Sequence, residues 1–312
     1  MNSMENKRIV FLGTPSISAY VLEGLIKAGF NIVLVVTKED KVRKRGRELE
    51  PSEVAKVAAE YNIPVHKPHK LNLDYQPLVD ADPDLLLTFA YGQIIKEDIL
   101  HLSKYKPLNL HASLLPKYRG AAPIQYALRN GDKKTGVSLM EMIKEMDAGE
   151  VYAVEELAID DEDNYTSLSE KVGKTALKLA IEKLPLYFEN KLSPVKQDPA
   201  FVSFCPTIKK EEEHLNLNQS CISFINQVRS LSLTPGGYLL FNDEMLKIYK
   251  ASFVSNKVTS SVGAILRAHK GDLHLQLEDG IVNLDLLQRP GKKILNTSDF
   301  NNGNHLEGVI LR

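Results

Sequence analysis

Hydrophobic positions in the first 190 residues alternate between short continuous apolar runs and stretches with helical spacing. The apolar runs cover residues 9–12, 32–36, 85–89, 108–111 and 137–142, and helical spacing covers 17–26, 53–61 and 165–190. Continuous apolar runs of this length are typical of parallel strands that are buried on both faces. Strand and helix repeated in this order predict a doubly wound, mostly parallel, Rossmann-like sheet with right-handed crossovers.

The pattern changes in the last third of the chain. Residues 191–208 contain three prolines and little periodicity, which predicts a linker. A helix with apolar positions from Phe224 to Leu231 is ended by Thr-Pro-Gly-Gly at 234–237. It is followed by short alternating runs at 238–241, 246–252, 262–267, 273–277 and 281–287. Several short strands at this spacing predict a small antiparallel, OB-like β-barrel. We therefore predict one domain over 1–190, a linker over 191–208 and a barrel domain over 209–312.

Composition narrows the class of protein. A chain of 312 residues with 43% hydrophobic and 25% charged residues is typical of a globular protein with two domains. No apolar run approaches the roughly 20 residues of a membrane span, and no signal peptide opens the chain, so we expect a cytoplasmic protein without membrane contact. Cys205 and Cys221 form neither a disulfide framework nor a metal-ligand spacing. We expect both to be buried, and we expect no metal.

An amide and an imidazole lie two residues apart at the end of the 108–111 strand. Because strand side chains alternate, Asn109 and His111 point to the same side, at the sheet edge where ligands bind in this fold. A later carboxylate, Asp147 before an Ala-Gly turn, can orient that imidazole. Such a set suits acyl transfer, because the amide stabilises an oxyanion and the imidazole moves a proton. From the residues alone, other carboxylates fit equally well: Asp132, Asp160 and Asp161.

The same stretch carries a resemblance to a known family. Asn109-x-His111, the run Ser-Leu-Leu-Pro-x-Tyr-Arg-Gly at 113–120 and the Asp-Ala-Gly at 147 resemble the signature of 10-formyltetrahydrofolate-dependent formyltransferases. The likeness extends from 8–15 to 291–303. It implies that Asn109, His111 and Asp147 are catalytic, and that a C-terminal, tRNA-binding barrel over 209–312 follows the catalytic domain.

The resemblance also implies a reaction. A formyl group would pass from the co-substrate 10-formyltetrahydrofolate to the α-amine of methionine on initiator methionyl-tRNA, for translation initiation. Folate and tRNA are then the expected partners, with no stable protein partner. An enzyme that formylates an amino sugar nucleotide would have the same catalytic core and is the alternative. A tRNA- or folate-binding protein without turnover is disfavoured because all three catalytic residues are present.

Two further segments acquire a folate role through the resemblance. The implied contacts are Ser113, Leu114, Leu115 and Pro116, with a wall made of Leu87, Phe89, Tyr91, Gly92 and Gln93. From the residues alone, the first segment is an apolar turn fixed by proline. Leu87 and Phe89 fit a buried core strand equally well. The turn at 13–15 has no dinucleotide-binding glycine pattern, which argues against bound NAD.

A basic segment at 38–47 carries six basic and two acidic residues. Such a run is often a solvated loop. It follows the carboxyl end of the 32–36 strand, however, which places it on the edge of the predicted site. In the family, this insertion contacts the acceptor end of tRNA, which implies binding by Lys41, Arg43, Lys44 and Arg45. The sequence departs from the family in having Lys before Arg45 and no tryptophan anywhere.

Overall fold

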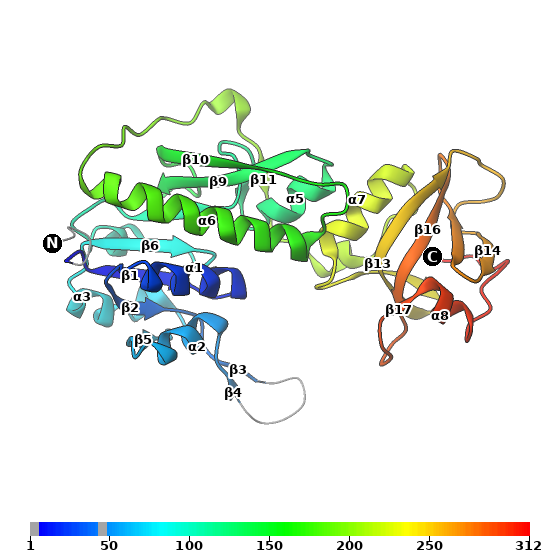
Figure 1. The fold of residues 1–312 in the computed structure, drawn as a ribbon, viewed down its shortest axis with the longest axis horizontal. Helices are drawn as coiled ribbons and strands as arrows, with labels where there is room; N and C mark the ends of the chain where they lie inside the picture. The colour runs from blue at the N-terminus through cyan, green and yellow to red at the C-terminus, as the bar shows by residue number, and fades with distance from the viewer. Residues whose placement is uncertain (1–5, 43–48) are drawn as a thin grey trace. The chain divides into compact units, whose positions relative to one another are not determined.

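A seven-stranded sheet organises the N-terminal half of the molecule (Figure 1). The structure is a computed structural model that describes residues 6–42 and 49–312. The strand order is β10-β9-β7-β6-β1-β2-β5. Five strands run parallel: β1 (Ile9–Gly13), β2 (Ile32–Val36), β5 (Val65–His66), β6 (Leu85–Phe89) and β7 (Leu108–His111). β9 (Lys134–Glu141) and β10 (Val151–Ala158) extend the sheet antiparallel. The predicted doubly wound, mostly parallel sheet is confirmed.

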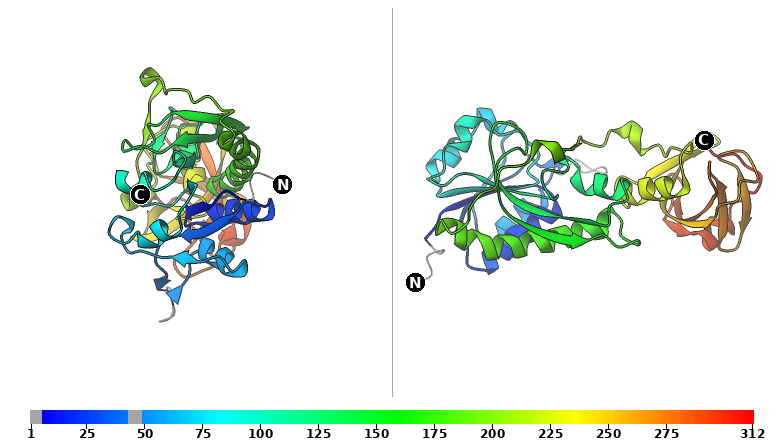
Figure 2. Two further views of the ribbon diagram at one scale, coloured as in Figure 1. Left: turned by 90° about the vertical axis from the view of Figure 1, so that its left-hand side faces the viewer. Right: turned by 90° about the horizontal axis from the view of Figure 1, so that it is seen from above.

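The central strands carry apolar side chains on both faces of the sheet. Helices therefore cover both faces. Val10 and Leu12 pack on one face with Leu71 and Leu78. That face is covered by η1 (Leu71–Leu73), α3 (Gln76–Asp80) and α4 (Glu97–Leu100). The other helices of this half are α1 (Ser16–Lys27), α2 (Glu53–Glu60) and α6 (Tyr165–Phe188). Figures 1 and 2 show α1 and α6 side by side along the sheet.

A second sheet, antiparallel throughout, forms the C-terminal part. Its order is β12-β13-β16-β15-β14, with β17 paired to β16. The strands are β12 (Gly237–Phe241), β13 (Glu244–Ser255), β14 (Ile265–His269), β15 (Asp272–Gln276), β16 (Ile281–Gln288) and β17 (Leu295–Asn296). α7 (Cys221–Leu231) and α8 (Thr297–Asn301) contribute Phe224 and Phe300 to its core. The predicted antiparallel C-terminal sheet is confirmed.

The last residues of the chain join the two edges of this sheet. On one side the Ile265 N–H donates to the carbonyl of Val309 at 2.8 Å, and on the other the Arg312 N–H donates to the carbonyl of Leu240 at 3.0 Å. Unpaired strand edges are otherwise exposed to pairing with another chain. The C-terminal tail thus forms hydrogen bonds with backbone groups of both edge strands, β14 and β12. In this way it closes the sheet in the manner of a barrel.

The chain separates into two compact units. The first holds residues up to 123, with 134–158 and 169–205, and the second holds 124–133, 159–168 and 206–312. These bounds differ from the predicted ones: α5 (Pro123–Arg129) lies mostly with the C-terminal unit, and 191–205 belong to the N-terminal unit. A two-stranded parallel ladder between β8 (Arg119–Gly120) and β11 (Phe204–Cys205) fastens that segment.

A few short elements complete the described fold. They are the antiparallel pair β3 (Lys41–Val42) and β4 (Leu49–Glu50), and the 3-10 turns η2 (Pro199–Phe201) and η3 (Lys210–Glu213). Within residues 6–42 and 49–312, every helix is too short or too polar to cross a membrane.

Candidate active site

His111 ends β7 with its ring almost completely buried. Its Nε2 lies 2.8 Å from the backbone carbonyl of Tyr118, and its Nδ1 lies 3.7 Å from Oδ2 of Asp147. A carbonyl can only accept a hydrogen bond, so Nε2 carries the hydrogen and Nδ1 of the neutral ring keeps a lone pair. The ring therefore offers a proton acceptor beside a carboxylate, and that carboxylate would face the charge once a proton arrives.

Asp147 is held from both its side chain and its backbone. Its Oδ2 accepts a hydrogen bond of 2.8 Å from the Gly120 N–H, and its side chain is 16% exposed. Its φ is +50°, in the left-handed region that costs a residue with a side chain about 1 kcal/mol or more. This conformation is held by the bond from Gly120 to the carboxylate and by a turn hydrogen bond from the Ala148 N–H to the Glu145 carbonyl at 3.3 Å.

Asn109 is fixed by the neighbouring strand. Thr88 of β6 is in register with it, and the Thr88 hydroxyl donates to its Oδ1 at 2.7 Å. Because the carbonyl side of the amide is occupied, the NH₂ group points elsewhere. Within the described part of the chain, that NH₂ group donates to no protein acceptor. It therefore remains available to an oxygen that becomes negative during a reaction.

Side-chain hydrogen bonds hold the loop after β7 together. The Ser113 hydroxyl donates to the carbonyl of Lys117 at 2.6 Å, and Ser138 of β9 donates to the carbonyl of Ser113 at 2.7 Å. The Ser138 hydroxyl also accepts the N–H of Leu115 at 3.1 Å. Ser113 is completely buried, so its side chain supports the loop, whereas 114–116 are partly exposed. Their predicted contact with folate stays a prediction.

The predicted wall divides into a buried and an exposed part. The side chains of Leu87, Phe89 and Tyr91 are at most 3% exposed, so they lie in the core. Gly92 is exposed with a φ of +79°, and Gln93 is half-buried. Burial also raises the pKa of the Tyr91 hydroxyl. Any contact with folate from this segment must therefore involve Gly92, Gln93 or backbone groups.

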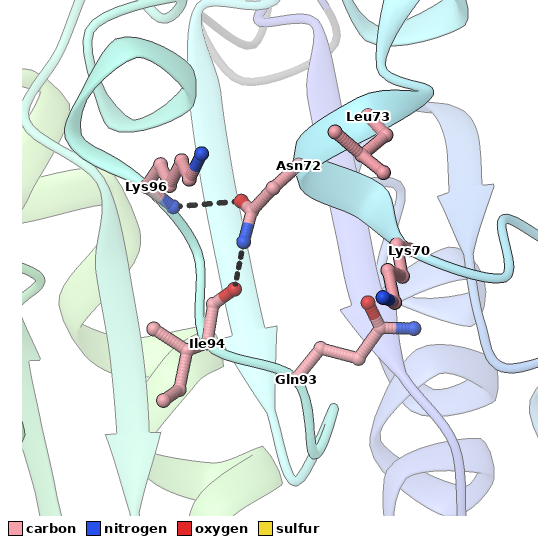
Figure 3. Close-up of a pocket in the computed structure, with 6 residues that line it drawn as sticks. All are labelled: Lys70, Asn72, Leu73, Gln93, Ile94 and Lys96. Carbon is pink, nitrogen blue, oxygen red and sulfur yellow. Dashed lines mark hydrogen bonds between the residues drawn. The ribbon is translucent and has the colours of Figure 1, made fainter.

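Gln93 lines an open hollow (Figure 3) with Lys70, Asn72, Leu73, Ile94 and Lys96. Asn72 joins its two rims, accepting the Lys96 N–H at 2.9 Å and donating to the Ile94 carbonyl at 2.8 Å. Leu73 and Ile94 are exposed. Among the described residues, neither lysine ammonium forms an ion pair. Two exposed lysine side chains thus stand beside two exposed apolar side chains at this hollow.

The predicted tRNA-binding residues are only partly visible. Arg43, Lys44 and Arg45 lie outside the described residues. Lys41 is exposed in β3, where it lies opposite Glu50 of β4 in the register of the two strands. Within the described ranges there is no group of three or more His, Cys, Asp or Glu residues placed to hold a metal ion.

Family models of formyl transferases match most of the chain. The formyl transferase model matches residues 7–184, and the model of the formyl transferase C-terminal domain matches 207–305. These two regions contain the His111–Asp147 pair and the antiparallel C-terminal sheet, respectively. The chain belongs to the formyl transferase family.

Curated relatives narrow this class. The methionyl-tRNA formyltransferase of Mesoplasma florum is 37% identical over 298 residues, and that of Lactobacillus acidophilus is 40% identical over 300 residues. Each match covers 95% of both chains. These full-length relatives are thus methionyl-tRNA formyltransferases.

A solved structure shows the same fold. The N-formyltransferase of Helicobacter canadensis, in complex with folinic acid and dTDP-3-aminofucose, superposes with a TM-score of 0.68 at 19% identity. The match covers 91% of this chain and 99% of that one.

Proposed function

We propose that this chain transfers a formyl group from 10-formyltetrahydrofolate to the α-amine of methionine on initiator methionyl-tRNA. One observation carries the proposal: the NH₂ group of Asn109 has no protein acceptor among the described residues and belongs to the same short strand as His111, which faces Asp147. The full-length relationship to methionyl-tRNA formyltransferases supports the choice of acceptor.

In this mechanism the neutral amine attacks the formyl carbon, and a new C–N bond forms. The oxygen of the tetrahedral intermediate accepts a hydrogen bond from the Asn109 amide, and the proton of the amine passes to Nδ1 of His111. The Asp147 carboxylate, whose Oδ2 lies 3.7 Å from Nδ1 in the structure, then faces the imidazolium. The C–N10 bond breaks, and the proton leaves His111 for N10, directly or through water. Nε2 keeps its hydrogen on the Tyr118 carbonyl throughout.

The donor in this proposal is the 10-formyl form of tetrahydrofolate. Membership of the formyl transferase family, and the folinic acid in the Helicobacter canadensis structure, support a folate as donor. We place it against the partly exposed 114–116 loop and the Gly92–Gln93 corner, because these flank the ends of β7 and β6.

A second acceptor class has one observation in its favour. The Helicobacter canadensis N-formyltransferase with the same fold holds an amino sugar nucleotide. The decisive experiment uses two parallel incubations of the purified protein with 10-formyltetrahydrofolate. One contains charged initiator tRNA as the acceptor, and the other contains dTDP-3-aminofucose. We expect formyl-methionyl-tRNA and no formylated sugar. Formylation of the sugar alone would overturn the proposal.

The basic segment gives a sharper test of the acceptor. If it binds tRNA, Arg45→Ala should lower kcat/KM for charged tRNA by roughly 10-fold or more, the effect of losing about 1.4 kcal/mol of binding. The KM for folate should stay unchanged. Neutralising Lys41, Arg43 and Lys44 together should reduce the salt dependence by roughly 0.7–0.9 for each phosphate that is no longer neutralised. Lys174→Ala, an exposed lysine of α6, is the matched control. Unchanged tRNA kinetics in both basic-segment variants would remove the segment from tRNA binding.

A further inference from the structure

Gln197 makes four hydrogen bonds in a segment for which the sequence predicted only a linker. Its Nε2 donates to the carbonyls of Asp147 at 2.9 Å and Gly149 at 2.7 Å. Its Oε1 accepts from Nε of Arg119 at 3.0 Å and from Nη2 at 2.8 Å. A glutamine amide has two N–H donors and two acceptor lone pairs. Every one of them is used here, so the side chain has a single well-defined position.

These bonds connect the two loops that shape the site. Arg119 follows Tyr118, whose carbonyl holds Nε2 of His111. Arg119 also precedes Gly120, whose N–H holds the Asp147 carboxylate. On the other side, Gln197 binds the backbone carbonyl of Asp147 itself and that of Gly149, two residues later in the chain. Gln197 is therefore the link between the backbone that orients the imidazole and the backbone that carries the carboxylate.

Within the Asp147 loop, one long hydrogen bond closes the turn, from the Ala148 N–H to the Glu145 carbonyl at 3.3 Å. Asp147 has a φ of +50°, and a left-handed residue with a side chain persists only where its neighbours hold it. Gly149 adds a second constraint, since a Cβ there would lie 2.0 Å from the carbonyl oxygen of Glu141. The loop is thus packed tightly against β9 and is also clamped by Gln197.

The same segment holds the other loop by backbone contacts. The Tyr118 N–H donates to the hydroxyl of Ser203 at 2.9 Å, and the Ala121 N–H donates to the carbonyl of Cys205 at 2.9 Å. The Cys205 thiol lies 3.1 Å from the Tyr118 carbonyl that His111 also uses. Residues 197–205 therefore contact both the 118–121 backbone and the 147–149 backbone.

We propose that Gln197 is a positioning residue for formyl transfer, which fixes the Asp147 carboxylate relative to His111 by bridging Arg119 to the 147–149 backbone. This proposal rests on the proposed function, because it assumes that Asp147 acts on His111. Among the described residues, the hydrogen-bond partners of the Gln197 side chain are Arg119, Asp147 and Gly149, and none of these is a predicted folate or tRNA contact. Its effect should therefore fall on turnover and leave substrate binding unchanged.

The test begins with Gln197→Leu, which keeps the size of the side chain and removes all four hydrogen bonds. We expect kcat to fall roughly 10- to 100-fold, the effect of misplacing a catalytic group by about 1 Å. The KM values for folate and charged tRNA should change by less than about twofold. A wild-type kcat would overturn the proposal.

A double-mutant cycle separates positioning from general damage. If Gln197 acts through Asp147, then adding Gln197→Leu to Asp147→Asn should lower kcat by less than about twofold more. If Gln197→Leu only damaged the structure, its fold-loss of kcat would multiply with that of Asp147→Asn in the double variant. That result would overturn the proposal.

Two further variants keep the test decisive. Gln197→Glu retains the acceptor for Arg119 but cannot donate to the Asp147 and Gly149 carbonyls, so it should fold and still lose kcat. Gln276→Leu is the matched control, because Gln276 is fully buried in the C-terminal sheet and donates to the carbonyls of Leu277 and Gly280, each at 2.9 Å. It should lower the Tm while kcat stays unchanged. Full activity of Gln197→Glu, or equal kcat losses in the leucine variants of Gln197 and Gln276, would overturn the proposal.

Failure of the proposed function gives a different result. In that case the wild-type protein does not formylate charged tRNA. The Gln197 variants are then measured with whichever acceptor the wild-type protein does formylate, and the same comparison of kcat decides the positioning role.

Discussion

The loops beyond β7 and the C-terminal sheet both use amide side chains to bind backbone carbonyls, but the bonds hold different parts of the molecule. In the first region, Gln197 and the Tyr118 carbonyl act on the backbone and side chains around His111. In the second, Gln276 and Asn301 tie turn carbonyls, such as those of Gly280 and Lys270. Gln276 and Asn301 are buried and Gln197 is half-buried, and polar groups withdrawn from water need hydrogen-bond partners. In the first region, that pairing also holds the backbone next to the predicted catalytic residues His111 and Asp147.

The backbones of the two regions differ in the same way. In the C-terminal sheet, Asn242, Asp243 and Lys270 have positive φ angles, and all lie in two tight hairpins, β12–β13 and β14–β15. Such hairpins require left-handed residues. Tyr118 and Asp147 have φ angles of +61° and +50° outside any hairpin. At the site, the left-handed residues instead adjoin the Tyr118 carbonyl and the Asp147 carboxylate, which lie beside the His111 ring.

The comparison predicts its largest effect at the reactive groups themselves. Asn109→Ala and Asp147→Asn should each lower kcat by roughly 100-fold or more, because one removes an oxyanion donor and the other the partner of the imidazole. Steady-state formylation and circular dichroism together check that turnover is lost while the fold remains. Near-normal turnover in either folded variant would remove that residue from the mechanism.

A glycine pair tests the packing of the two regions. Gly149→Ala should lower the free energy of unfolding by about 3 kcal/mol or more, because its Cβ would overlap the Glu141 carbonyl oxygen at 2.0 Å. Gly271→Ala, in the β14–β15 turn, meets no atom within 4 Å and should change it by less than about 0.5 kcal/mol. Urea denaturation measures both. Equal stabilities would show that the 147–149 loop moves away from β9 easily.

The smallest effect concerns the one cysteine in each region. Burial raises the pKa of the Cys205 thiol to about 11, and the nearby Asp147 charge adds to this against the opposing N–H of Ala122. Since the folded pKa exceeds the reference value of 9.0, its contribution is complete below pH 9 and is lost as pH rises through 11.

We therefore expect the wild-type protein to lose on the order of 2 kcal/mol more than Cys205→Ala between pH 9 and 11. Urea denaturation at several pH values measures this difference. Cys221, whose pKa burial raises to about 12, remains in both proteins and contributes equally. Identical pH dependence in the two proteins would contradict the buried, protonated state of Cys205.

Apolar patterning located most of the strands but not their directions. The predicted strands at 85–89 and 108–111 coincide with β6 and β7, because strands buried on both faces are apolar throughout. The run at 137–142 falls within or next to β9, which proves antiparallel. β10 was not predicted, because this edge strand carries Glu155 and Glu156 and alternates between half-buried and exposed positions.

The site was predictable only as far as strand periodicity reaches. Asn109 and His111 share one face because they are two residues apart, and their role in catalysis stays a prediction. Thr88 was not predicted, although its register with Asn109 follows once neighbouring strands are aligned. Gln197 and the Tyr118 carbonyl left no signal, since one lies in an aperiodic segment and the other is a backbone group that any residue provides.

The most direct test of formyl transfer by this chain follows labelled formyl from 10-formyltetrahydrofolate to charged initiator tRNA, with wild-type protein and His111→Ala in parallel. We predict formyl-methionyl-tRNA with the wild type and a rate lower by roughly 100-fold or more with His111→Ala, since that variant lacks the ring that accepts the proton of the amine. Transfer at the same rate by both proteins, or no transfer by the wild type, would contradict this mechanism.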